Sequence, residues 1–203
     1  FKLKEIDKKK LYNFLREMEF NRLLSSAISK YGELKFSKEK NINNINNINN
    51  INKINKENYF LIQDEAKLKK ILKEVETKGE LAIDTETTSL NPHSADLVGI
   101  SISFEIGRAF YLPLGHKNEN NLKEEEVLKI LKPILEDSSI KKIGQNIKFD
   151  FIVLYRRGIT MNSMEDTMLM SYTLDAGKNR HNMDILSEIH LGHKTISFKD
   201  IVG

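Results

Sequence analysis

Apolar residues recur with a helical period at the start of the chain, and this helical period is absent from the segment that follows. Leu11, Phe14, Leu15 and Met18 follow a three-to-four spacing, which predicts an amphipathic helix over residues 7–28 that needs a partner surface. Residues 41–56 repeat Asn-Ile-Asn with a period of three, which fits neither a strand nor an α-helix. We interpret this repeat as a low-complexity linker or insertion, in preference to a functional asparagine array or an aggregation-prone polar tract.

Strand and helix patterns alternate from residue 59 onward. An apolar run predicts a strand at Tyr59–Ile62, and Asp64 and Gly79 bracket a helix. Later segments predict a three-strand antiparallel meander at Leu81–Glu86, Leu97–Glu105 and Arg108–Leu114, with a turn at Gly107. The remaining pattern predicts helices at Lys123–Glu136, Lys148–Arg157, Asp166–Leu174 and Met183–His190, and a strand at Ile140–Ile143. This order predicts an α/β fold with a mixed sheet flanked by helices.

Composition narrows the classes of site that the chain can hold. The 203 residues include no Cys, which excludes disulfides and thiolate metal sites and favours a cytoplasmic setting. No apolar run approaches the ~20 residues of a membrane helix, so we expect no membrane partner. The net charge of +3 does not by itself indicate nucleic acid. His190 and His193 stand without a third nearby His or Cys, and we interpret them as solvated side chains.

Two acidic residues mark the end of the first meander strand. In Leu81-Ala-Ile-Asp-Thr-Glu, Asp84 and Glu86 are two positions apart, so both carboxylates leave the same face of the strand. Neighbouring carboxylates attract a hard cation such as Mg²⁺ or Mn²⁺, which keeps its other positions for water or substrate phosphate. The competing interpretation is a pair of ordinary acids flanking a turn.

A second acidic site follows in Ile143-Gly-Gln-Asn-Ile-Lys-Phe-Asp150, where a strand breaks at Gly144 and Asp150 falls in the first turns of a helix. An acid at this place is also common simply to complement the helix dipole. The combination of a strand-end Asp-x-Glu, a meander, a helix and this turn resembles the acidic two-metal 3′-to-5′ exonucleases of ribonuclease H-like fold. The segment Gly177–Phe198 resembles, more narrowly, the proofreading domain of the bacterial family A DNA polymerases.

The resemblance divides the chain into three regions. Residues 59–203 are similar to the 3′-5′ exonuclease domain, and Leu11–Leu24 is similar to the helix that closes the 5′ nuclease domain of the same polymerases. We therefore expect residues 1–36 to be the helical end of a 5′ nuclease domain, 37–58 to be the linker, and 59–203 to be an incomplete exonuclease domain. The chain starts with Phe1 rather than Met, and we interpret it as an internal piece of a longer polymerase.

The resemblance also implies a site. Asp84, Glu86 and Asp150 would hold two divalent metal ions, Mg²⁺ or else Mn²⁺ or Zn²⁺, that activate water and stabilise the leaving 3′ oxygen. The family contacts an unpaired DNA 3′ end at positions that match Leu90, Asn146, Arg180 and Phe198. It implies a monomer whose partners are DNA and the rest of the same polymerase chain.

One family motif has no counterpart, and this keeps other functions open. The third motif, Tyr-x-x-x-Asp, should follow Gly203; Tyr172-Thr-Leu-Asp175 has the wrong spacing and does not replace it. We therefore expect this chain to be weak or inactive as an exonuclease. Two alternatives are an inert exonuclease-like domain that only supports a polymerase and an exonuclease of the same superfamily that acts on structured RNA.

Overall fold

The computed structural model describes residues 6–33, 58–117 and 120–196. The chain divides into two compact units, Phe1–Asn46 and Asn47–Gly203, which are described separately. The predicted linker at 37–58 lies almost wholly outside the described residues and stays a prediction. No helix of the described ranges is long and apolar enough to cross a membrane.

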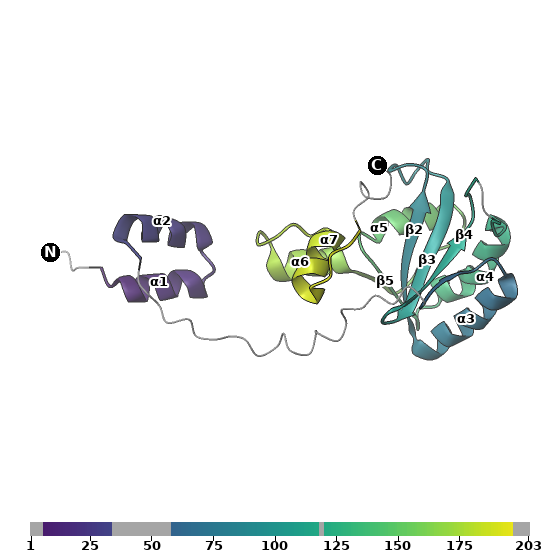
Figure 1. Ribbon diagram of the computed structural model, residues 1–203, viewed down its shortest axis with the longest axis horizontal. Coiled ribbons are helices and arrows are strands. Elements are labelled where there is room, and N and C mark those ends of the chain that lie inside the picture. The colour runs from purple at the N-terminus through teal and green to yellow at the C-terminus, as the bar shows by residue number, and fades with distance from the viewer. Residues whose placement is uncertain (1–5, 34–57, 118–119, 197–203) are drawn as a thin grey trace. The chain divides into compact units, whose positions relative to one another are not determined.

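The described part of the first unit, residues 6–33, is a pair of helices where the sequence predicted one. Helix α1 spans Lys8–Glu17 and α2 spans Asn21–Tyr31, lying side by side in Figure 1. The prediction of a continuous helix over 7–28 is therefore wrong at Met18–Phe20, where Glu19 adopts a left-handed φ of 56°. The fold-back supplies the missing partner surface: Tyr12 is fully buried, and its hydroxyl donates to the carbonyls of Ala27 and Gly32.

The second unit is built on a six-stranded mixed sheet in the order β1-β4-β3-β2-β5-β6. The predicted meander is confirmed, because β2, β3 and β4 pair antiparallel in sequence order. Strand β1 pairs parallel with β4 at one edge, and β5 and β6 run parallel to β2 at the other. The strands are β1 Tyr59–Leu61, β2 Glu80–Thr87, β3 Leu97–Glu105, β4 Arg108–Pro113, β5 Lys141–Gly144 and β6 Met164–Asp166.

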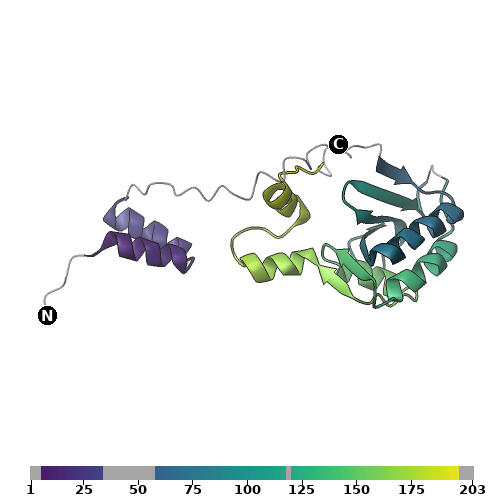
Figure 2. The ribbon, with the colours of Figure 1, turned by 90° about the horizontal axis from the view of Figure 1, so that it is seen from below.

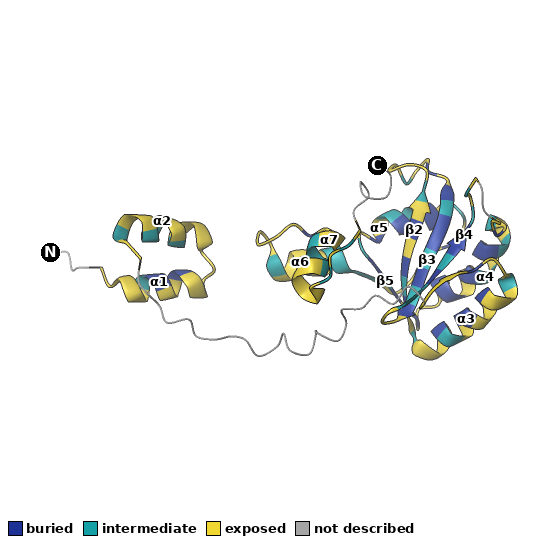
Figure 3. Cartoon of the chain, in the orientation of Figure 1, coloured by how far each residue is buried: buried dark blue, intermediate teal, exposed yellow. Residues whose placement is uncertain are grey.

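Three helices bury one face of this sheet. Alternate residues of the central strands, such as Leu81, Ile83, Ile100 and Ile102, join one core with the apolar stripes of the helices. Figure 3 shows the buried side of these helices turned toward the strands and exposed positions turned outward. These helices are α3 Glu65–Lys78, α4 Glu124–Glu136 and α5 Lys148–Tyr155.

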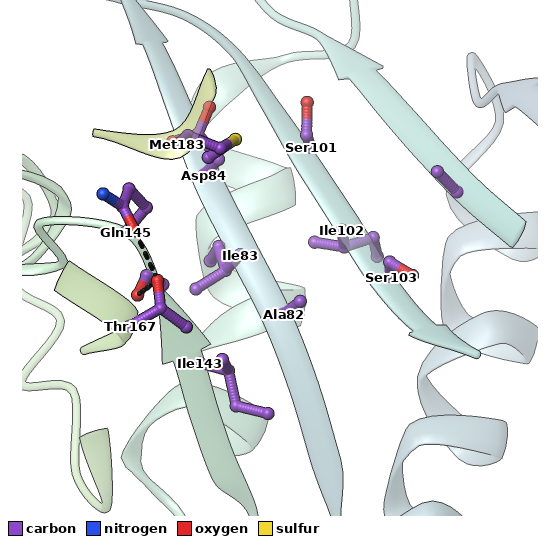
Figure 4. A pocket seen from close by; sticks show the side chains of 12 residues that line it. Ala82, Ile83, Asp84, Ser101, Ile102, Ser103, Ile143, Gln145, Thr167 and Met183 are labelled. Atoms are coloured by element: carbon purple, nitrogen blue, oxygen red, sulfur yellow. Dashed lines mark hydrogen bonds between the residues drawn. The ribbon is translucent and has the colours of Figure 1, made fainter. Parts of the chain in front are cut away.

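The opposite face of the sheet carries small and polar residues. Ala82, Asp84, Ser101, Ser103 and Ala109 line a hollow of about 260 Å³ on this side. Two further helices, α6 Thr167–Asp175 and α7 Met183–Leu191, follow the edge strand β6 (Figure 2). Met183, at the start of α7, reaches the rim of the same hollow, beside Asp84 in Figure 4.

A buried lysine completes the end of α4. Lys142 has no exposed surface, and its ammonium donates to the carbonyls of Asp137 at 2.5 Å, Ile140 at 2.6 Å and Ile134 at 3.5 Å. Burial lowers the pKa of this ammonium, while the Asp137 carboxylate opposes that effect. The lysine thus satisfies carbonyls that the end of a helix leaves without partners.

Replacing Lys142 with methionine is expected to lower the free energy of unfolding by about 2 kcal/mol, because buried carbonyls lose their donor while ammonium desolvation is relieved. The neighbouring Lys141 is exposed and forms a surface ion pair of 3.3 Å with Glu165. Lys141→Met is the matched control, expected to change stability by less than about 0.5 kcal/mol. Chemical denaturation of the two variants measures the difference; equal effects would contradict the capping role.

Candidate active site

Strand β2 presents Asp84 and Glu86 on the open face of the sheet. Asp84 pairs across the sheet with Ser101, and Glu86 pairs with Gly99. The regular register ends in an irregularity between Glu86 and Thr87, where the strand leaves the ladder. The intervening Thr85 turns the other way and is buried. The two acids therefore share one face, as their spacing predicts.

Asp150 comes to the same place from helix α5. Its side chain is 2% exposed, and its Oδ1 accepts hydrogen bonds from Thr85 N at 2.8 Å and from Thr85 Oγ1 at 2.6 Å. Both hydrogen bonds go to one oxygen, so Oδ2 stays outside this pair of contacts. Thr85 thus fixes the carboxylate of α5 against the strand that carries Asp84 and Glu86.

The carboxylates affect one another electrostatically. Burial, the Asp150 carboxylate and the Glu86 carboxylate together raise the pKa of Asp84 to about 6. Burial also raises the pKa of Asp150, although the hydrogen bonds from Thr85 oppose the change. Asp84 keeps some exposed surface because it opens on a cavity, while neighbouring atoms still remove part of the hydration of its carboxylate. Such crowded negative charge favours either a bound proton or a bound cation.

A cavity of about 510 Å³ joins these acids to two of the predicted contact residues. Asp84, Glu86 and Asp150 line it together with Leu90 and Asn146. Leu90 is 95% exposed on the loop after β2, where no core packing explains an apolar side chain. Asn146 has a left-handed φ of 57° in the turn between β5 and α5. The turn is tight, since a side chain at Gly144 would lie 2.8 Å from Ile147.

The other two predicted contact residues lie apart from this cavity or outside the described residues. Arg180 lines a separate hollow of about 650 Å³ between α6 and α7, together with Tyr172 and His181. Gln145 borders both cavities, so the two hollows meet at one side chain. Phe198 lies outside the described residues, and its predicted contact with DNA stays a prediction.

Sequence reasoning missed three groups that support the site. Thr85 gave no signal beyond its place between two acids. Strand β6 was missed because its three residues are too short to show a period, so Asp166 was taken only as a helix start. The third group is Tyr111, whose hydroxyl contacts His116 Nε2 at 2.7 Å and lies over Gly99.

Gly99 is the feature of the sequence that could have indicated the position of Tyr111. A side chain there would begin 2.0 Å from the Tyr111 hydroxyl, so only glycine lets the ring cross β3 toward β2. Burial and the Glu86 carboxylate raise the pKa of Tyr111, which places Tyr111 within electrostatic reach of Glu86.

Comparison with known sequences decides the family. A 3′-5′ exonuclease family profile matches residues 59–203. The chain belongs to the 3′-5′ exonuclease family. The exonuclease region is 41% identical over 165 residues to DNA polymerase I of Rhizobium leguminosarum, covering 71% of this chain and 16% of that protein. It is 40% identical over 156 residues to DNA polymerase I of Pseudomonas aeruginosa, covering 72% and 17%. The resemblance to family A DNA polymerases is thereby confirmed.

Solved structures confirm the fold of the exonuclease domain. Escherichia coli RNase D, an exoribonuclease involved in structured RNA processing, matches with a TM-score of 0.55 at 19% identity, covering 68% of this chain and 35% of that one. The catalytic core of Trypanosoma brucei RRP6 matches with a TM-score of 0.57 at 14% identity, covering 71% and 38%. At these identities the likeness shows a shared ribonuclease H-like fold. The polymerase relatives are about six times longer than their matched part, since the chain covers 16% and 17% of them.

The donor set of the candidate site fits a hard divalent cation in part. Asp84 and Asp150 are crowded oxygen donors: burial and the Asp150 carboxylate raise the pKa of Asp84, and burial and the Glu86 carboxylate raise the pKa of Asp150. A bound cation relieves such a charge pattern. Among the described residues, however, no group of at least three His, Cys, Asp or Glu side chains is already arranged around one ion position. Mg²⁺ is often held by one or two carboxylates with water and substrate phosphate in its other positions, so this arrangement suffices for substrate-assisted binding.

Proposed function

We propose that the intact protein removes nucleotides from the 3′ end of DNA, as the proofreading activity of a DNA polymerase I. The pairing of Asp84 with Asp150 carries this proposal, because a partly desolvated carboxylate beside a buried one on an adjoining element makes a place for divalent cations. The family match and the polymerase relatives support the same activity. We infer that the protein acts as a monomer in the cytoplasm, with DNA as its partner.

Each acid has a distinct part in the proposed mechanism. Asp84 and Asp150 would hold one of two divalent ions, Mg²⁺ or else Mn²⁺ or Zn²⁺, and Glu86, on the same face of β2, would complete the site when substrate is present. Bound cations would supply an activated water and offset the negative charge that develops on the scissile phosphate. Thr85 holds Asp150 in place through two hydrogen bonds, so its carboxylate does not reorganise during the reaction.

The contact residues suit an unpaired strand better than a duplex. Leu90 offers an exposed apolar side chain beside the acids, a type of group that packs against a sugar or an unstacked base. Asn146 shares its cavity, while Arg180 lies in the adjoining hollow and can meet a backbone phosphate farther along the strand. Phe198 would add a stacking surface. Such contacts read the backbone and base faces, so we expect little dependence on sequence.

The test is degradation of a 5′-labelled DNA single strand by the full-length gene product and by the 203-residue chain, with Mg²⁺, with Mn²⁺ and with EDTA. We expect a ladder shortened from the 3′ end that needs the cation, and weaker activity from the 203-residue chain. An RNA strand of the same sequence separates the two nucleic acids. Absence of cation-dependent shortening in the full-length protein would support the inert-domain alternative, and a preference for RNA would support the structured-RNA exonuclease.

A further inference from the structure

Asp166 binds two separate segments through one carboxylate. It stands at the end of β6, and its Oδ1 accepts from Met168 N at 2.9 Å and Leu169 N at 3.4 Å, which caps α6. The same Oδ1 accepts from Asn146 N at 3.0 Å, and Oδ2 accepts from Ile147 N at 3.0 Å. A helix cap needs only the first two contacts. The other two reach 19 and 20 residues back in the sequence, to the turn before α5.

That turn determines where Asp150 lies. Asn146 is held in the left-handed region, which asparagine tolerates better than other residues with a side chain and which its hydrogen bond to Asp166 fixes here. Two successive N–H groups converge on Asp166, and such paired donors bind a carboxylate well. Helix α5 begins directly afterwards at Lys148, so Asp150 is placed by the same turn.

Thr167 extends the connection to the loop that carries Arg180. Its Oγ1 lies 2.6 Å from Gln145 Oε1, the contact dashed in Figure 4, and 3.1 Å from the carbonyl of Gly144. Gln145 Nε2 in turn donates to the carbonyl of His181 at 2.8 Å. His181 is buried, and its Nδ1 contacts Ser171 Oγ on α6 at 2.8 Å. The backbone beside Arg180 is therefore anchored through Gln145, which borders both cavities.

We propose that Asp166 and Thr167 are positioning residues that set the two halves of the exonuclease site relative to each other. Asp166 fixes the turn that places Asp150, and Thr167 orients Gln145 and through it the loop of Arg180. Neither side chain is required to touch the substrate. This inference rests on the proposed exonuclease function. In it, Asp166 and Thr167, at the end of the edge strand β6, hold the acids that bind the metal in a fixed position relative to the residues that bind the DNA strand.

Substitutions of Asp166 and Thr167 are expected to change different kinetic constants. Asp166→Asn leaves one oxygen that can cap α6 and still accept from Asn146 N, but it turns an NH₂ group toward Ile147 N, which loses its acceptor. We expect kcat of the full-length gene product on single-stranded DNA to fall about tenfold with little change in KM, the effect of losing one charged hydrogen bond. Thr167→Val removes the contact to Gln145, and we expect KM to rise about fivefold at nearly unchanged kcat. Thr167→Ser keeps the hydroxyl and should restore the wild-type KM.

Asp64 offers a matched control for the first variant. It caps α3 by accepting from Ala66 N at 2.7 Å, on a helix that contributes no residue to either cavity. Asparagine caps helices about as well as aspartate, so Asp64→Asn should leave both kinetic constants unchanged. Thermal unfolding of Asp64→Asn measures how much stability a helix-cap substitution removes by itself, and the same measurement on Asp166→Asn shows any further loss of stability.

The outcomes separate this inference from the function on which it rests. An active wild type with Asp166→Asn kinetically equal to Asp64→Asn would overturn the inference and leave the exonuclease assignment standing. Equal KM values for Thr167→Val and Thr167→Ser would overturn the role of Thr167, even if Asp166→Asn proved too unstable to assay. A wild type that shortens no DNA strand would overturn both the function and the inference.

Discussion

Replacing Asp84 with asparagine is expected to slow cation-dependent shortening of single-stranded DNA by at least about a hundredfold, the scale on which removing one stabilising group from a charged transition state acts. Asp84 is the acid whose pKa is raised furthest toward neutrality, and Asp150 and Glu86 both contribute to that rise. An amide keeps the shape of the side chain but contributes no charge to hold a cation. The variant should therefore fold normally and fail at chemistry.

The same substitution is expected to make the cation-free domain more stable near neutral pH. Asparagine removes a partly desolvated charge whose pKa is raised by burial and by the Asp150 and Glu86 carboxylates, so its ionised form costs stability at neutral pH. Loss of activity together with a higher melting temperature is hard to obtain from a folding defect. That combination would identify the acid pair as a functional site maintained at a cost in stability.

Glu80 provides the control for this experiment. It lies at the other end of β2, an even number of residues from Asp84 and so on the same face, and it is exposed. Glu80→Gln also removes one carboxylate from the strand, outside the cavity that holds the acids. Rates of the full-length protein and melting curves of the 203-residue chain should match the wild type. An Asp84→Asn protein that retained wild-type activity would remove the main support for the proposed function.

Strand-end acids were the most predictable part of the site. The period of two in β2 places Asp84 and Glu86 on one face, and the Gly144 break before α5 places Asp150 near the same strand end. Contacts between segments far apart in the sequence could not be predicted in this way. The hydrogen bonds from Thr85 to Asp150 span 65 residues, and no local pattern signals them. Hydrogen-bond partners of this kind follow from the tertiary fold rather than from propensity.

The two errors in the elements have local causes. The helix predicted over 7–28 has a continuous apolar period, but burying Tyr12 requires a second surface, and the chain obtains it by folding back at Glu19. Strand β6 has only three residues. It is held beside β5 by parallel backbone pairing with Lys142, Ile143 and Gly144. Periodicity detects amphipathic faces, so it cannot find an element that is held by backbone hydrogen bonds alone.

Divalent cations are expected to stabilise the 203-residue chain more at about pH 7.5 than at about pH 5, because a carboxylate must lose its proton before it can bind a metal. Asp84 has a pKa of about 6 in the folded chain against an ordinary value of 3.8. The folded state thus binds this proton more tightly than the unfolded state. Without metal, the resulting stabilisation is complete below pH 3.8 and is lost as pH rises to about 6.

A bound cation reverses the cost of that ionisation. Above pH 6 the ionised pair repels itself in the free protein and is neutralised in the complex, so the gain from Mn²⁺ should grow through the same range in which intrinsic stability falls. Melting curves with and without MnCl₂, at matched ionic strength on both sides of pH 6, measure this difference directly. Asp84→Asn should abolish the pH dependence of the Mn²⁺ effect, and Glu80→Gln should keep it. A Mn²⁺ effect of equal size at both pH values would show that the ion binds elsewhere, since the Asp84 carboxylate cannot be both protonated and ligated.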